Sequence, residues 1–158
     1  MNGHWHGLKL GPTAYGRVAR VVVEDSYSTG VTLSNSPTFS ALQWELDDVT
    51  SQKNEGRGYE VVSIPGPLYG VSMGQWSRTY TYANRAGGIY FIGSASAPIN
   101  GVRIVGGFMG EDGNDILYFD TYGDGHKINS TYIELAGQGY CGREIATPPT
   151  GQGHGLFA

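Results

Sequence analysis

The residues best suited to metal chemistry lie near the N-terminus. His4 and His6 flank Trp5, which puts two imidazoles on one side of an extended segment, as in half of a zinc or nickel site. No CxxC or HExxH motif supplies further ligands, and the sequence identifies no partner for His126 or His154. We therefore interpret these histidines as solvated or packing side chains, and predict no metal and no cofactor.

Carboxylates are the second group that could carry chemistry. The acidic stretch 111–115 (EDGND), followed by Asp120 and Asp124, has the composition of a calcium loop but lacks the spacing of an EF-hand, so we interpret it as two turns flanking a strand. Glycoside hydrolysis needs two carboxylates that flank one bond, and Glu45, Asp47 and Asp48 fit by type only. Neither group defines a site on its own.

A nucleophile is equally hard to find. Cys141 has no histidine nearby in the sequence to activate a thiolate, and no G-x-S-x-G elbow is present. We therefore predict no catalytic residue and no enzymatic activity.

One row of side chains could face a ligand. Tyr80 and Tyr82 are two positions apart in a predicted strand, so they share a face, and Arg78 lies on that face as well. Aromatic rings stack on sugars, and a guanidinium group can bond to hydroxyls. We predict these three residues to be ligand-facing.

Composition narrows the class of protein. Glycine supplies 26 of 158 residues and charged residues only 15%, which with 11 Tyr, 5 Phe and 3 Trp favours strands joined by tight turns. A net charge of −4 with no Lys/Arg cluster argues against nucleic acid as a partner. No apolar run is long enough for a membrane helix, and the single cysteine excludes an intrachain disulfide.

Alternating apolar residues predict about nine strands and no helix of three turns. The polar segment 47–58 is expected to be a loop between two of them. The expected strands are 17–24, 31–34, 38–46, 59–64, 68–81, 88–95, 101–109, 115–121 and 127–136. Such spacing is typical of a β-sandwich or barrel.

The two ends differ from this central part. Residues 1–16 are rich in glycine and without periodicity, and we predict an attachment arm anchored by Trp5, Leu8 and Leu10. Residues 137–158 form a Gly/Pro-rich tail that either packs on a neighbouring subunit or is a loose terminus. The predicted domain is therefore 17–136.

The central part resembles the tumour-necrosis-factor/C1q-like jelly-roll domains of phage and bacterial structural proteins. The resemblance rests on TFSALQWELDD (38–48) followed by YEVVSIPGPLYGVSMGQW (59–76), and on echoes of two later strands at 114–117 and 130–135. The matching residues in the first part are Ala41, Leu42, Trp44, Glu45, Pro65, Tyr69, Val71 and Trp76. The resemblance implies an all-β jelly-roll β-sandwich.

The resemblance also implies an assembly and a function. Three jelly rolls would associate through aromatic and aliphatic faces, which would absorb apolar side chains beyond the needs of one core. The residues expected in the core or trimer interface are Trp44, Tyr69, Trp76, Tyr90, Phe108, Tyr118 and Tyr132. The implied protein is a non-enzymatic phage virion component (a capsid decoration, fibre-tip or minor tail subunit) that contacts other virion proteins and a host glycan.

Three alternatives remain open at this point. A carbohydrate-binding module or lectin on a β-sandwich would use exposed aromatic residues beside polar ones. A cytokine-type ligand is disfavoured by the missing signal peptide and disulfides, and a glycan hydrolase by the missing carboxylate pair.

Overall fold

The computed structural model describes residues 7–66, 70–121, 127–129, 131–134 and 156–157, which form strands and loops and contain no helix. The strands are β1 (Leu8–Leu10), β2 (Gly16–Glu24), β3 (Val31–Ser34), β4 (Ala41–Gln52), β5 (Arg57–Val62), β6 (Val71–Tyr82), β7 (Gly87–Ile92), β8 (Ile99–Asn100), β9 (Arg103–Gly110), β10 (Leu117–Asp120), β11 (Lys127–Asn129), β12 (Tyr132–Glu134) and β13 (Leu156–Phe157).

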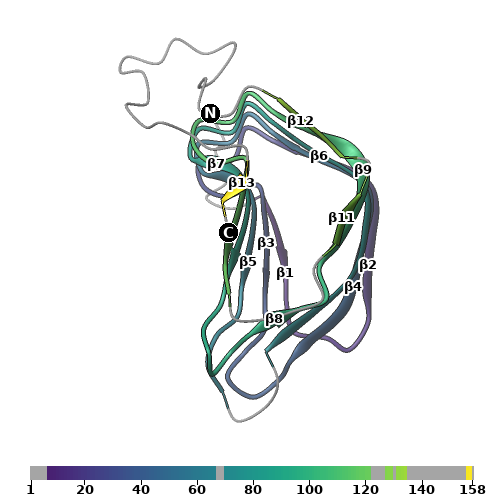
Figure 1. Ribbon diagram of the computed structural model, residues 1–158, viewed down its shortest axis with the longest axis vertical. Helices are drawn as coiled ribbons and strands as arrows, with labels where there is room; N and C mark the ends of the chain where they lie inside the picture. Colours follow the sequence, from purple (N-terminus) through teal and green to yellow (C-terminus); the bar gives the residue numbers. More distant parts are fainter. Residues whose placement is uncertain (1–6, 67–69, 122–126, 130, 135–155, 158) are drawn as a thin grey trace.

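The chain alternates between two facing sheets whose strands are all parallel (Figure 1). Sheet A has the order β1-β3-β5-β7-β10-β13. Sheet B has the order β11-β9-β6-β4-β2, with β12 also paired to β9 and β8 to β6. One strand of each sheet with its two connections makes a coil, and successive coils stack in a β-solenoid.

The coils repeat with a nearly constant length. In sheet A, Val31 pairs with Tyr59, Tyr59 with Ile89 and Ile89 with Leu117, which are 28, 30 and 28 positions apart. In sheet B, Leu46 pairs with Trp76, again 30 positions apart. Equivalent residues of successive coils therefore form columns along the solenoid.

The predicted jelly-roll sandwich is wrong. A jelly roll pairs its strands antiparallel, whereas the paired strands here are parallel and in register, and the antiparallel contact among described residues is an isolated bridge between Ser94 and Ala97. Alternation of apolar residues indicates a strand with one buried face but does not say which neighbour it pairs with. A strand of a solenoid and a strand of a sandwich therefore have the same local pattern.

The core lies between the two sheets. Trp76 of β6 is 1% exposed and reaches across to sheet A, where its ring lies 5.5 Å from Tyr59 and 5.6 Å from Phe91, measured between centroids. The core around these rings includes aliphatic side chains from both sheets. They are Leu33, Val61, Ile89 and Leu117 of sheet A and Leu46, Val49 and Ile104 of sheet B. Burial of these columns is the main stabilising contribution.

A ladder of polar side chains runs through one turn of each coil. Asn54 donates from Nδ2 to Oδ1 of Asn84 at 2.7 Å, and Asn84 donates from Nδ2 to Oδ1 of Asp112 at 2.9 Å. Oδ1 of Asn54 accepts the backbone N–H of Ser26 at 3.0 Å. All four residues are buried, so the ladder supplies partners for backbone groups that the turns remove from water.

The backbone of this turn repeats as well. The residue before each ladder position has a positive φ, at Asp25 (54°), Lys53 (54°), Ala83 (52°) and Glu111 (54°). This left-handed conformation costs about 1 kcal/mol for residues other than glycine, so four in the same column mark a required turn geometry.

Gly58 lies against the ladder, and its substitution tests this packing. A Cβ there would lie 2.3 Å from Oγ1 of Thr81 and 2.7 Å from Nδ2 of Asn84. We expect Gly58→Ala to lower the free energy of unfolding by about 2 kcal/mol, measured by urea denaturation. Gly11→Ala is the matched control, because a Cβ at Gly11 has no described heavy atom within 4 Å; equal effects of the two variants would contradict the packing.

The expected loop 47–58 is largely strand. β4 continues to Gln52, because Val49 and Ser51 face inward and are buried. The polar composition suggested a loop, but the strand runs through Asp47 and Asp48, with Asp48 in the left-handed conformation at a φ of 58°.

Candidate functional site

The outer face of sheet B carries a column of residues in the left-handed conformation. Arg20 of β2, Asp48 of β4, Arg78 of β6 and Gly106 of β9 have φ angles of 56°, 58°, 49° and 69°. They are 28, 30 and 28 positions apart, the same offsets as the paired residues around them. Repetition of this conformation in consecutive coils sets the charged residues Arg20, Asp48 and Arg78 at matching heights on neighbouring strands.

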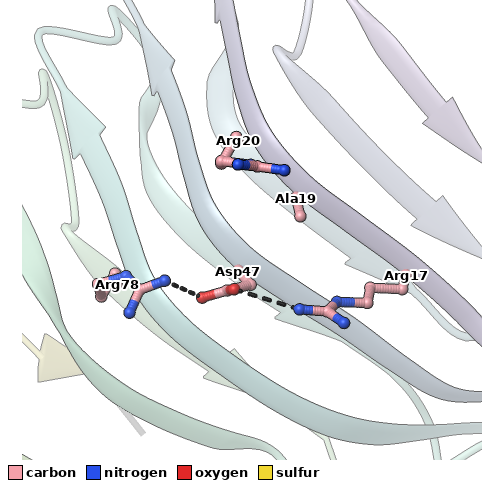
Figure 2. A pocket seen from close by; sticks show the side chains of 5 residues that line it. All are labelled: Arg17, Ala19, Arg20, Asp47 and Arg78. Carbon is pink, nitrogen blue, oxygen red and sulfur yellow. Dashed lines mark hydrogen bonds and ion pairs between the residues drawn. The ribbon is translucent and has the colours of Figure 1, made fainter.

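Asp47 joins two arginines across three strands. Its Oδ1 accepts from Nη2 of Arg78 at 2.7 Å, and its Oδ2 lies 3.4 Å from Nη2 of Arg17 (Figure 2). The arginine side chains are 60% and 64% exposed. Exposed pairs of this kind contribute at most about 1 kcal/mol to stability, so their main effect here is to orient the guanidinium groups.

These side chains line an open depression of about 480 Å³ with Arg20 and Ala19. Three guanidinium groups and the carboxylate of Asp47 line it, and the carboxylate of Glu45, outside this lining, lies 4.0 Å from Nε of Arg17. The side chain of Arg20 makes no hydrogen bond or ion pair with the described residues, and Figure 2 shows it beside the Arg78–Asp47–Arg17 chain of contacts. The depression can accept an anion without breaking an existing pair.

Tyrosines continue the same face along β6. Tyr80 and Tyr82 are half-buried and alternate with the buried Thr79 and Thr81, so their rings point outward. The ring of Tyr82 lies 6.2 Å from that of Phe108 on β9. The structure thus places Arg78, Tyr80 and Tyr82 together on the outer face, where the sequence predicted a ligand-facing row.

Sequence reasoning missed Arg17, Arg20 and the role of Asp47. The sequence does contain a signal for these residues, the constant distance along the chain between paired strands. Ala19 pairs with Asp47, 28 positions later, and Asp47 pairs with Ser77, 30 positions later. An internal repeat of that length would have aligned β2, β4 and β6 and brought the three arginines to one surface.

The acidic residues considered for calcium and for hydrolysis have structural surroundings. Asp112 belongs to the buried ladder, where it accepts from Asn84 and Thr81. Glu45 lies 4.0 Å from Nε of Arg17. Within the described part of the chain, no three His, Cys, Asp or Glu side chains come together as a metal site. His4, His6, His126, His154, Asp124 and Cys141 lie outside the described residues.

The residues expected in a core or trimer interface fall into three groups. Trp44 and Trp76 are buried in the core and Tyr90 is buried as well, at 6% exposure, whereas Phe108 and Tyr118 are half-buried. The rings of Tyr90 and Tyr118 stack 5.0 Å apart, Arg57 lies over Tyr90, and burial, with a smaller effect of Asp115, raises the pKa of Tyr90 to about 12. Tyr69 and the side chain of Tyr132 are outside the described part.

The expected attachment arm is partly built into the fold. Leu8 and Leu10 lie in β1, which pairs with β3, and Leu10 is buried in the core of this chain. Trp5 and most of the tail 137–158 fall outside the described residues.

Comparison with known proteins gives no relative from which a function could be inferred. Neither the family models, nor the curated proteins, nor the solved structures searched contain a match to this chain. In the described part, no helix is long and apolar enough to span a membrane.

Proposed function

We propose that this chain is a non-enzymatic binding protein that presents the outer face of sheet B to an acidic polysaccharide. The observation that carries the proposal is the convergence of Arg17, Arg20 and Arg78 on one depression lined by a single carboxylate, that of Asp47. Guanidinium groups bind carboxylates through paired, charge-assisted hydrogen bonds.

The surroundings of the depression favour a sugar polymer over a simple anion. Tyr80, Tyr82 and Phe108 supply ring surface on the strands beside Arg78, and Thr50, paired with Tyr80, is a half-buried neighbour with a hydroxyl. Rings that stack and hydroxyls that hydrogen-bond are the chemistry of carbohydrate sites. An open, extended face suits a long polymer better than a small enclosed ligand.

Titration with oligogalacturonate, a linear chain of sugar carboxylates, tests the proposal. We expect Arg20→Gln to weaken binding about tenfold, because a charge-assisted contact is lost while Asp47 keeps both of its arginines. Arg85→Gln is the matched control, since Arg85 is similarly exposed but pairs with Glu55 away from the depression. The fully methyl-esterified oligosaccharide should not bind. Equal binding of the acidic and esterified chains would contradict the proposal.

The virion role and the homotrimer remain predictions without a test. Both followed from the jelly-roll resemblance, and the parallel solenoid removes that reason for them. The glycan-binding alternative did not depend on strand pairing, only on exposed aromatic and polar side chains. We therefore retain glycan binding as the proposed activity, now on a β-solenoid and not on a β-sandwich.

A further inference from the structure

A second depression adjoins the first along the edge of sheet B. It measures about 300 Å³ and is lined by Tyr15, Gly16, Arg17, Gln43 and Glu45. Arg17 lines both depressions, so they adjoin at this side chain, over β2 and β4. Any ligand longer than one sugar ring that fills the arginine depression can extend into this one.

Tyr15 gives the second depression a stacking surface. This tyrosine directly precedes β2 and is 75% exposed, which is unusual for so large a ring. The backbone next to it is held firmly, because a Cβ at Gly16 would lie 2.4 Å from the ring of Trp44. Tyr15 is therefore presented by a well-packed part of the edge.

The charge of the second depression differs from that of the first. Glu45 lies 4.0 Å from Nε of Arg17, and Gln43 adds a neutral amide, so the lining holds one cation and one anion. A second carboxylate of the ligand would be repelled by Glu45, whereas hydroxyl and amide groups of a neutral sugar find both donors and acceptors.

The spacing along the strand fits more than one sugar unit. Tyr15 and Arg20 are five positions apart, which in an extended strand corresponds to roughly 15 Å. We infer that the two depressions are successive subsites of one linear ligand in which acidic and neutral sugars alternate, the neutral ring on Tyr15 and the carboxylate at Arg20 and Arg78. This inference rests on the proposed function and specifies its substrate class.

Competition between two acidic chains of equal length tests it. Hyaluronan hexasaccharide alternates glucuronate with N-acetylglucosamine, whereas oligogalacturonate hexamer carries a carboxylate on every unit. We expect the protein to bind the alternating chain about tenfold more tightly, Tyr15→Ala to abolish that preference, and Tyr15→Phe to keep it. Tyr27→Ala, which changes another exposed tyrosine outside both depressions, should have no effect.

The outcomes separate the two proposals. If both acidic chains bind equally and Tyr15→Ala changes neither, the second subsite is wrong while the acidic-polysaccharide function stands. If neither chain binds the unaltered protein, the proposed function is wrong, and the subsite with it. Thermal melting of each variant shows whether the fold is kept, which we expect because Tyr15 is largely exposed.

Discussion

Replacing Asn84 by leucine is expected to lower the free energy of unfolding by about 3–5 kcal/mol. Asn84 is fully buried at the centre of the ladder. Its Nδ2 lies within hydrogen-bond distance of Thr81 Oγ1 and Asp112 Oδ1, both at 2.9 Å, and of the Ser51 carbonyl at 3.0 Å. Its Oδ1 accepts the backbone N–H of Asn54 at 3.2 Å. Leucine has a similar size but removes all these hydrogen bonds, and the buried backbone N–H of Asn54 loses its acceptor.

Urea denaturation measures this loss. Asn129→Leu is the matched control, because Asn129 is exposed in β11, and we expect that change to stay within about 0.5 kcal/mol. A loss below about 1 kcal/mol for Asn84→Leu would mean that the ladder does not hold the coils together.

Stability is expected to fall as the pH rises from about 4 to 7, through the titration of Asp112. Burial raises the pKa of Asp112 from 3.8 to about 7, although hydrogen bonds from Asn84 and Thr81 oppose the shift. Between these values the folded chain holds a proton that the unfolded chain has released, so rising pH favours unfolding. A shift of that size corresponds to at most about 4 kcal/mol.

The variant Asp112→Asn isolates this contribution. Its amide is neutral at every pH and keeps the oxygen that accepts from Asn84. We expect the variant to be more stable than the natural chain at pH 8, by a few kcal/mol, and close to it at pH 4. Unfolding free energies measured from pH 4 to 8 for both proteins check this. Parallel curves would show that Asp112 does not titrate with folding.

The sequence was sufficient for strands but not for their pairing. β2 and β3 are rich in β-branched residues, and both strands lie where the sequence predicted them. The choice between parallel and antiparallel neighbours depends on contacts between residues 28–30 positions apart, which no local pattern contains. The sequence nonetheless contains a repeat that indicates the coils: the polar residues Ser26, Asn54, Asn84 and Asp112 follow one another at the same intervals of 28–30 positions.

The site was predictable only in part, for the same reason. Tyr80 and Tyr82 share a face by strand geometry alone, so their outward direction followed from the alternation. Arg17 and Arg78 meet at Asp47 only because three coils are stacked in register. Arg20 lines the depression from a left-handed backbone conformation, which its residue type does not suggest.

The parallel register of β2 on β4 is the claim on which the site and both proposals depend, and disulfide trapping tests it directly. With Cys141 changed to serine, we expect both Val22→Cys/Thr50→Cys and Glu24→Cys/Gln52→Cys to cross-link, because both pairs are Cα partners 28 positions apart. Neighbouring strands about 4.8 Å apart are within disulfide range. Rapid cross-linking of Val22→Cys/Thr50→Cys and Glu24→Cys/Asp48→Cys, with none for Glu24→Cys/Gln52→Cys, would show antiparallel pairing and contradict the solenoid.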